Sequence, residues 1–435
     1  MKKILALLLA LCMVFALCAC GAKTDAPAND AADEPAADAA DAADAAGDAA
    51  PAADDSALMV GMVCVEDENS GYDFAHIDGL RKAAAAVGVP AENLFFKYNT
   101  PEDETCYDNI IDLIEQGCDI VFTDSYGHQD YAHTAAVENP DVTIVSMTGD
   151  YAWTTDLANY KNAFCHTYES RYVSGVVAGM KLAEMIENEE LTDANYDADG
   201  NVKLGYVGAF PYAEVVSGYT SFYLGVKSIV DNVVMDVRFT NSWFDPIAEA
   251  AAAEAFIAEG CCIISQHADS TGAPSAVQAA RDGGANVYCV GYNISMLEVA
   301  PTAALTSASN DWSVFYTFAL QCMLDGTDIP VDWSEGYATG ANYITELGAS
   351  CAAGTAEKVA EVEAAIADGS LNVFDCSTFT VDGETVESFT ALDTDGDFVP
   401  DTGEAIVDGV FQESVLRSAP YFALNIDGIN QLISE

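Results

Sequence analysis

The sequence is poor in basic residues. Its 435 residues include 15 Lys and Arg against 70 Asp and Glu, which gives a formal net charge of −55 at pH 7. A nucleic-acid-binding surface must be basic to neutralise phosphates, so nucleic acid is excluded as a main partner. The same charge disfavours electrostatic attachment to anionic lipids. The charge therefore narrows the range of partners but leaves the fold open.

Several catalytic and metal-binding motifs are also missing. No Cys-x-x-Cys or Cys/His spacing typical of structural zinc is present. No glycine-flanked nucleophilic serine and no glycine-rich phosphate loop stands out. We therefore expect a binding protein rather than an enzyme, with no cofactor, and keep a nucleosidase-type hydrolase as an alternative.

Thirteen cysteines are present, three of them within the first twenty residues. The other ten lie mostly inside apolar stretches, for example Val63-Cys64-Val65 and Cys261-Cys262-Ile263. Cysteine in such a setting packs as a small apolar side chain. We expect these thiols to be mostly reduced and buried, although an exported chain with this many cysteines would usually suggest disulfides.

Residues 1–20 have the pattern of an export signal. Lys2 and Lys3 precede an apolar run, Ile4–Ala19, which is too short for a comfortable transmembrane helix. Leu17-Cys18-Ala19-Cys20 resembles the lipobox of bacterial lipoproteins, and this resemblance implies cleavage before Cys20 and acylation of its thiol. We therefore expect a lipid anchor on the extracytoplasmic face of the cell membrane. An ordinary signal peptide is the alternative.

Residues 21–56 follow as an Ala/Asp-rich tether. Seventeen Ala, nine Asp and one Glu lie between residues 22 and 56, with almost no β-branched and no aromatic residue. Such a composition buries too little apolar surface to offset chain entropy, so the segment is predicted to be disordered.

From residue 57 the sequence alternates between strand and helix patterns. Apolar runs of strand length occur at 58–65, 94–97, 120–123, 142–146, 203–207, 234–239, 261–265 and 287–290. Helical patterns lie between them: at 73–87, after Thr100-Pro101, at 168–187, through 222–229, after Pro246 and at 274–281. This alternation predicts an α/β protein of two doubly wound lobes with a ligand cleft between them. We place lobe 1 at 57–165, lobe 2 at 166–292, a return to lobe 1 at 293–345 and a C-terminal segment completing the lobes, with an acidic loop, at 346–435.

The residues that follow the predicted strands share one chemistry. They are aromatic or short and polar, and the seven strand ends contain no Lys or Arg. Ligands of open α/β sheets bind beyond the carboxyl ends of the strands. Flat aromatic faces with hydrogen-bonding groups and no cation suit an uncharged, planar ligand rather than a phosphorylated one.

Three stretches carry a family resemblance. Residues 71–80 (GYDFAHIDGL), 205–211 (GYVGAFP) and 241–246 (NSWFDP) resemble the basic-membrane-protein family of substrate-binding lipoproteins of ABC importers. The similarity covers roughly residues 58–330. It implies a type I periplasmic-binding fold with a hinge, an ABC permease as partner, and a purine nucleoside or purine base as ligand.

The resemblance also suggests residues for the site. It assigns a base-stacking aromatic to Tyr72, the adjoining polar position to Asp73, and the second aromatic face to Phe210 with Trp243 nearby. Where the ribose-binding branch of the family has Gly-Val-Asp, this chain has Gly291-Tyr292-Asn293, and a lysine after the Leu305-Thr306-Ser307 stretch is missing. A free base such as adenine is therefore favoured over a nucleoside. With the other strand-end positions, the candidate ligand-binding residues are Tyr72, Asp73, Ser125, Tyr126, Thr148, Gly149, Phe210, Trp243, Asp245, His267, Asn293 and Trp312.

Some of these residues have plainer explanations. Asp245 before Pro246 is suited to cap a helix, and Trp243 could belong to the core. His76, inside a helical run, is expected to be structural. A receptor of the same fold for a sugar or a signalling molecule is a further alternative, because aromatic rings stack on sugars too.

An acidic stretch near the C-terminus has calcium-like spacing. Hard oxygen ligands alternate around a glycine at Asp393, Asp395, Asp397 and Asp401, and Glu404 stands twelfth when Asp393 is counted as first. The glycine is fourth instead of sixth, so the EF-hand match is partial. The spacing suggests a structural Ca²⁺ loop, with a solvated acidic turn as the alternative.

Overall fold

The computed structural model describes residues 57–390 and 403–432, and the chain from Asp55 onward forms one compact unit. The predicted signal peptide and tether, with Cys20, lie outside the described residues. So do four of the candidate calcium ligands, Asp393, Asp395, Asp397 and Asp401. The fifth, Glu404, accepts hydrogen bonds from the Ser388 hydroxyl and from the backbone N–H groups of Phe389 and Ile406.

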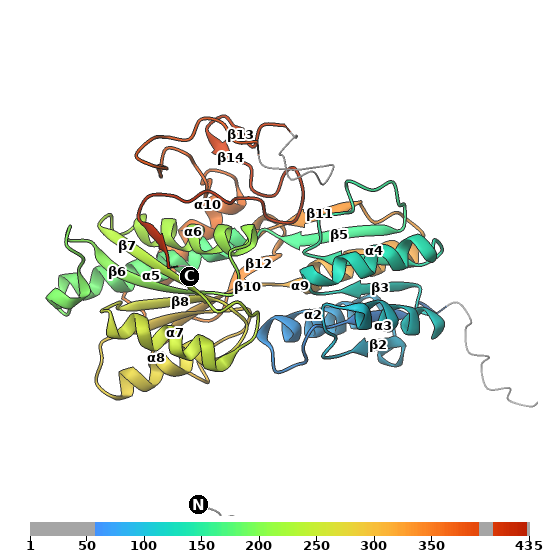
Figure 1. The fold of residues 1–435 in the computed structure, drawn as a ribbon, viewed down its shortest axis with the longest axis horizontal. Coiled ribbons are helices and arrows are strands. Elements are labelled where there is room, and N and C mark those ends of the chain that lie inside the picture. Colours follow the sequence, from blue (N-terminus) through green and yellow to red (C-terminus); the bar gives the residue numbers. More distant parts are fainter. Residues whose placement is uncertain (1–56, 391–402, 433–435) are drawn as a thin grey trace, which may run out of the picture. The chain divides into compact units, whose positions relative to one another are not determined.

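The first sheet is entirely parallel. Its strand order is β11-β5-β4-β3-β1-β2 (Figure 1). These strands are β1 (Val60–Val63), β2 (Leu94–Lys97), β3 (Ile120–Thr123), β4 (Thr143–Met147), β5 (Tyr160–Cys165) and β11 (Asp332–Glu335). Most are short, buried apolar runs, as expected for a parallel sheet with both faces covered.

Four helices cover the first sheet. One face carries α2 (Gly71–Val87) and α9 (Trp312–Asp325), and the other carries α3 (Glu104–Glu115) and α4 (Gln129–Glu138). The alternation of side chains along β1 sets the two cores: Val60 and Met62 pack with Leu80 of α2, whereas Val63 packs with Ile110 of α3. This layered unit is lobe 1.

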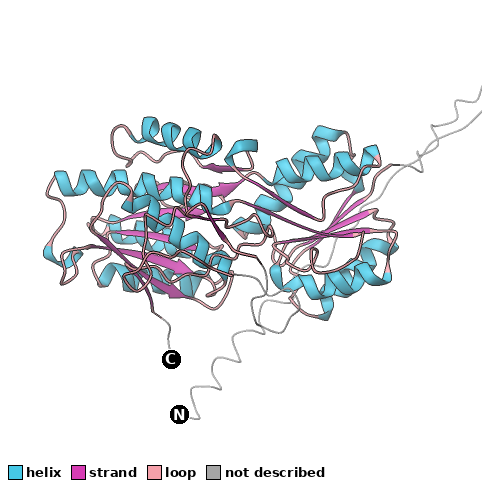
Figure 2. Cartoon of the chain, turned by 90° about the horizontal axis from the view of Figure 1, so that it is seen from above, coloured by secondary structure: helices cyan, strands magenta, loops and turns pink. Residues whose placement is uncertain are grey.

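The second sheet has the order β12-β10-β9-β8-β6-β7-β15, and only β12 is antiparallel to its neighbour. Its strands are β6 (Val202–Gly208), β7 (Val233–Phe239), β8 (Ile263–His267), β9 (Tyr288–Tyr292), β10 (Ala304–Asn310), β12 (Asn342–Ile344) and β15 (Ile429–Gln431). Helices α5 (Thr167–Glu187) and α6 (Ala213–Lys227) cover one face, and α7 (Pro246–Ala258) and α8 (Gly272–Asp282) cover the other. Figure 2 shows helices on both sides of the strands. This unit is lobe 2.

The chain crosses between the sheets three times, after β5, after β10 and between β11 and β12. Side chains from the three crossings are bonded to each other. The Asn310 amide donates to the Thr167 hydroxyl at 3.0 Å, and the Asn342 amide donates to Asn310 Oδ1 at 2.5 Å. Three short crossings joined in this way form a hinge about which two lobes can rotate.

The C-terminal segment packs mainly on lobe 2. It holds α10 (Thr355–Ala367), the hairpin of β13 (Ile406–Val407) and β14 (Val410–Phe411), and β15, which extends the second sheet. Phe374 stacks on Phe422 with ring centroids 4.2 Å apart, and both belong to the same core as α5 and α6.

The observed elements differ from the sequence pattern in three places. The helix expected to begin at Thr100-Pro101 begins at Glu104 and is capped by the Asp103 side chain. Strands β5 and β10 were not expected, because Lys161, Asn162 and the small polar residues of β10 break the apolar pattern although they are buried. As a result the stretch 293–345 is divided: β10 and β12 lie in lobe 2, and α9 and β11 lie in lobe 1.

Two further findings concern the described residues. The ten cysteines among them are unpaired, and nine of these are buried. No helix in the described part of the chain is long and apolar enough to cross a bilayer.

Candidate ligand-binding site

A cavity lies where the carboxyl ends of both sheets meet. In each sheet the first strand lies between the second and the third, β1 between β2 and β3 and β6 between β7 and β8, so the strand order changes direction there. Such switch points are where open α/β sheets bind ligands. Lobe 1 contributes residues that follow β1, β3 and β4, and lobe 2 contributes residues that follow β6, β7, β8 and β9. The lining residues are Val65, Tyr72, Asp124, Ser125, Tyr126, Thr148, Glu214, Trp243, His267, Asp269 and Tyr292.

Aromatic rings from both lobes form much of this lining. Tyr72, in the first turn of α2, is held by its hydroxyl, which donates to the Asp124 carbonyl at 2.6 Å. Trp243 stands on the opposite lobe in the loop after β7, with its ring edge-on to Phe210 at 5.1 Å. The two rings therefore line one cavity from opposite lobes.

A second chamber continues outward from this cavity. Tyr126, Thr148 and Glu214 line both, and the outer chamber is closed by Arg417, Ala419 and Pro420 of the C-terminal segment. The inner cavity measures about 20 Å³ and the outer chamber about 250 Å³. At the mouth, Tyr126 of lobe 1 meets Tyr212 of lobe 2 with ring centroids 6.1 Å apart.

Burial raises the pKa values of acidic groups on the lobe 2 side. Burial raises the pKa of Glu214 to about 7. Burial also raises the pKa of Asp269 well above its usual range, and nearby carboxylates add to this shift. His267 donates to or accepts from Glu214 through Nε2 at 3.3 Å, and burial lowers its pKa well below the usual value. A neutral His267 and protonated carboxyls can both donate and accept hydrogen bonds to an uncharged ligand.

The inner cavity lining holds no Lys or Arg, as expected of the strand ends, but one cation lies directly behind its wall and a second, Arg417, lines the outer chamber. The fully buried guanidinium of Arg171, from α5, sits over the ring of Tyr292 at 3.6 Å and donates to the Gln266 carbonyl at 2.5 Å. Its charge lowers the pKa of His267 further. The strand ends themselves hold no Lys or Arg; the cation comes from a helix whose sequence gave no sign of it.

Six of the twelve candidate residues line the cavity: Tyr72, Ser125, Tyr126, Thr148, Trp243 and His267. Four others lie close behind it. Asn293 donates to Asp269 Oδ1 at 2.9 Å, Phe210 stacks on Tyr212 with centroids 5.1 Å apart, Gly149 packs against Ser146 and Asn162, and Asp73 points into the interior of lobe 1.

Asp245 and Trp312 stand elsewhere. Asp245 caps α7 through hydrogen bonds from the backbone N–H groups of Ile247 and Ala248. Trp312 is corrected from a cleft wall to a core residue: it is 1% exposed and stacks on His76 with ring centroids 4.0 Å apart. His76 is structural as expected, since it also bonds to the Tyr316 hydroxyl at 2.7 Å.

Sequence reasoning did not select five of the lining residues: Val65, Asp124, Glu214, Asp269 and Tyr292. Four of them end a strand or lie within two residues after one, so their position was a usable signal. Glu214 lies in the first turn of α6, and nothing in the local sequence marks it as a cavity residue.

Comparisons with known proteins agree with this geometry. The sequence model of a family described as Bmp, ABC transporter substrate-binding protein PnrA-like, matches residues 62–338. A purine-binding protein of Brucella abortus is 32% identical over 271 residues, which cover 62% of this chain and 70% of that protein. A putative ABC transporter glucose-binding protein of Haloferax volcanii is 31% identical over 319 residues, 73% of each chain.

Solved structures agree on the fold. A solute-binding protein of an ABC transporter system from Aeropyrum pernix aligns with a TM-score of 0.59 at 15% identity, over 72% of this chain and 92% of that one. The likeness confirms the predicted α/β fold. The C-terminal residues that close the outer chamber lie beyond the range matched by the family.

Proposed function

The chain belongs to the family of PnrA-like ABC transporter substrate-binding proteins, and from this premise we propose that it captures an uncharged purine, an adenine-like base in preference to a nucleoside. Proteins of this class are not enzymes; they act on the extracytoplasmic side and deliver a small molecule to a membrane permease. The observation that carries the purine proposal is the pair of aromatic faces, Tyr72 and Trp243, that the two lobes present to one cavity.

The polar lining supports an uncharged ligand. Purines carry hydrogen-bond donors and acceptors around the ring edge, and Asp124, Glu214, His267 and Asp269 offer both kinds of partner at that edge. Arg171 lies behind Tyr292 and is not part of the lining, and Arg417 of the outer chamber is paired with Asp150. A phosphate in the inner cavity would therefore lie against carboxyl groups rather than against a cation. A nucleotide is therefore disfavoured.

Binding requires the lobes to move. A cavity of about 20 Å³ has room for about one water molecule, whereas ligand pockets measure roughly 300–1,000 Å³. The hinge at Thr167, Asn310 and Asn342 allows the required opening. The structure accordingly corresponds to a closed arrangement, and a base enters when the lobes separate.

Calorimetry tests the proposal. The protein is titrated with adenine, adenosine, guanosine, inosine, ribose and glucose, and adenine is expected to bind with micromolar or tighter affinity. Tyr72→Ala and Trp243→Ala should each weaken binding about 5- to 150-fold, because stacking on a base contributes about 1–3 kcal/mol. Tyr98→Ala removes an exposed aromatic side chain that directly follows β2 and lines neither the inner cavity nor the outer chamber, and it should bind as wild type. Absence of binding to every purine would overturn the proposal.

A sugar is the second candidate. The Haloferax relative is named as a putative glucose-binding protein, and carboxyl groups such as Glu214 and Asp269 are common acceptors for sugar hydroxyls. Tight binding of glucose or ribose with no response to purines would favour this reading.

We also propose a lipid anchor at Cys20 that holds the protein on the membrane surface. The lipobox-like sequence supports it. Expressed in a bacterium that processes lipoproteins, the wild-type protein should fractionate with membranes and carry an acylated N-terminal cysteine by mass spectrometry. Cys20→Ala should appear in the soluble fraction; an unmodified, soluble wild-type protein would contradict the anchor.

A further inference from the structure

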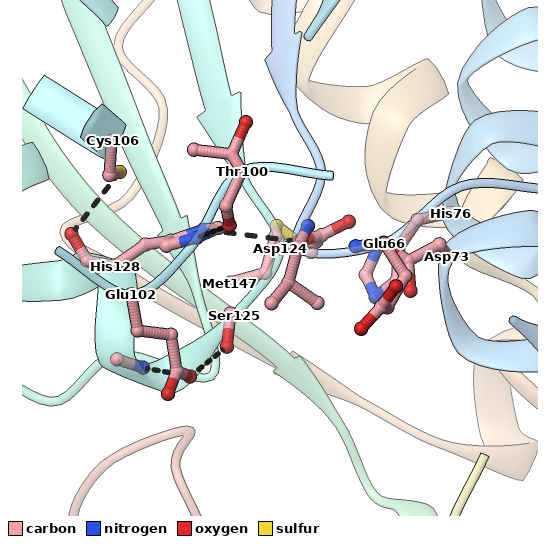
Figure 3. A network of polar contacts seen from close by, with 12 residues as sticks. Glu66, Asp73, His76, Thr100, Glu102, Cys106, Asp124, Ser125, His128 and Met147 are labelled. Atoms are coloured by element: carbon pink, nitrogen blue, oxygen red, sulfur yellow. Dashed lines mark hydrogen bonds and ion pairs between the residues drawn. The ribbon is translucent and has the colours of Figure 1, made fainter. Parts of the chain in front are cut away.

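Three metal-ligating side chains converge behind the lobe 1 wall of the cavity. Cys64 directly follows β1, Asp124 directly follows β3, and Asp73 lies in the first turn of α2. The Cys64 thiol and one oxygen of each carboxyl group lie within 4.8 Å of one another, and all three side chains are buried. Figure 3 shows the polar network around Asp73 and Asp124.

The two carboxyl groups are only half satisfied. Asp124 Oδ1 accepts from the Val65 N–H at 3.0 Å, and Asp73 Oδ1 accepts from the Glu66 N–H at 2.8 Å. The second oxygen of each, Oδ2, is buried and has no hydrogen-bond partner. Two facing, buried carboxyl groups cannot both stay charged without compensation, so the pair either shares a proton or takes up a positive partner. Arg81 does not serve, because it pairs with Glu68 at the surface.

His128 lies beside this cluster, next to Asp124. Its Nε2 lies 2.9 Å from the Thr100 carbonyl, so Nε2 carries the hydrogen and donates it. Nδ1 is then an acceptor; it is buried, has no partner, and lies 4.0 Å from Asp124 Oδ1 (Figure 3). A histidine fixed by a bond from one nitrogen to a backbone carbonyl, with the other nitrogen free, has the arrangement found in metal-binding histidines.

We propose that Cys64, Asp73 and Asp124, with His128 beside them, form a binding site for a divalent transition-metal ion of the zinc type. One soft sulfur with two carboxylates and an imidazole suits Zn²⁺ or Co²⁺, whereas Ca²⁺ and Mg²⁺ take six or more oxygen ligands. Ligand atoms around a tetrahedral zinc stand roughly 3.5 Å apart, given bonds of about 2.0–2.3 Å. Side-chain movements of about an ångström therefore complete the site.

A metal ion can reach this site through the cavity, and its binding releases the proton of the Cys64 thiol. Asp124 also lines the inner cavity, so an ion can reach the site when the lobes open. The Cys64 thiol loses its proton to solvent as the sulfur–metal bond forms, which makes binding tighter at higher pH. Because Tyr72 donates to the Asp124 carbonyl, the ion would also stabilise the segment that carries the stacking ring.

Cobalt titration of the chelator-treated protein tests the proposal. One equivalent of Co²⁺ should give the near-ultraviolet charge-transfer absorption of a cobalt–thiolate bond, and Zn²⁺ should displace it. Cys64→Ala should abolish that absorption, and Asp124→Asn should weaken metal binding at least tenfold. Cys118→Ala, a buried cysteine elsewhere in lobe 1, should behave as wild type. All variants keep the same background, so any signal from other cysteines is common to them.

Thermal melts show whether each variant is folded, and they provide a second measure of metal binding. Zn²⁺ should raise the melting temperature of the wild type and of Cys118→Ala but not of Cys64→Ala or of the isosteric Asp73→Asn. If the thiolate absorption is missing, or survives in Cys64→Ala, the proposal is wrong. The two carboxyl groups would then share a proton instead, and Asp73→Asn would stabilise the metal-free protein. Purine calorimetry on the chelator-treated protein keeps this result separate from the ligand proposal.

Discussion

Arg417 Nη1 lies 2.9 Å from Asp150 Oδ2, and this ion pair joins the C-terminal segment to lobe 1. The neighbouring Ser418 N–H donates to Asp332 Oδ2 of lobe 1 at 2.8 Å. The same segment is fixed to lobe 2 at Glu413, whose carboxyl group accepts from Ser217 of α6 at 2.5 Å. The segment therefore bridges the two lobes at the outer chamber of the ligand site.

Loss of this bridge should speed ligand release. Arg417→Ala removes the ion pair, whose partners are 17% and 14% exposed, and we expect dissociation of the bound ligand to become several-fold faster. Stopped-flow fluorescence measures this rate: the complex is diluted, and the emission of Trp243 is followed as the ligand dissociates. Arg238→Ala breaks a comparable ion pair, with Glu259, inside lobe 2 and should leave the rate unchanged. Equal rates in all three proteins would show that the bridge does not restrain opening.

Glu413 should make the protein less stable as pH rises. Burial raises its pKa to about 7 from the usual 4.5, so between these pH values the unfolded state loses its proton while the folded state keeps it. The unfolded state then binds fewer protons, and the free energy of unfolding falls from about pH 4.5 to about pH 7. Glu413→Gln removes this dependence, so its stability relative to wild type should rise from pH 5 to pH 8.

Urea unfolding at several pH values measures this effect. Glu361→Gln, an exposed residue of α10, provides the matched control and should follow the wild-type curve. A Glu413→Gln curve parallel to wild type across the range would contradict the raised pKa.

Trp312 should matter for stability and not for direct ligand contact. It is fully buried in the core between α2 and α9, and truncation of a buried tryptophan costs about 3–5 kcal/mol. Trp312→Phe keeps most of the volume and should bind ligand with nearly wild-type affinity while unfolding at lower urea. A loss of affinity as large as that of Tyr72→Ala would place Trp312 at the ligand after all.

The close packing of α5 on α6 depends on glycine. A side chain at Gly175 of α5 would overlap the carbonyl oxygen of Phe222 in α6. In the same way, a side chain at Gly225 of α6 would overlap the carbonyl oxygen of Tyr172 in α5. Gly175→Ala should therefore lower stability by about 1–3 kcal/mol or more, through forced separation of the helices. Gly403→Ala meets open space and should have little effect. Differential scanning calorimetry of both variants checks the difference.

The apolar strand patterns predicted the fold because the strands that carry them are parallel and mostly buried. A run such as Val60–Val63 must lie between helices whatever its partners, so its nature is local information. The strand Tyr160–Cys165 could not be predicted in this way, because Lys161 and Asn162 are polar residues that tertiary contacts bury. Burial of a polar residue depends on what packs against it, which no local pattern records.

The candidate site shows the same division. Tyr72, Tyr126 and Trp243 could be selected because they follow strands, and strand ends of a parallel sheet share one edge. Glu214 and Arg171 come from helices, and Arg417 comes from a segment more than a hundred residues after the last strand-end residue of the cavity. Their positions depend on how distant elements pack.

By itself, the sequence determined the two-lobed α/β class and predicted the sheet edge at which the candidate ligand residues gather, since period and strand length are local quantities. Only the tertiary structure decided which side chains meet. It moved Trp312 into the core, set Arg171 behind Tyr292 and brought Cys64, Asp73 and Asp124 together. The physical reason is that contacts between residues far apart in the chain depend on the register of the sheets and on helix packing, which the whole fold fixes at once.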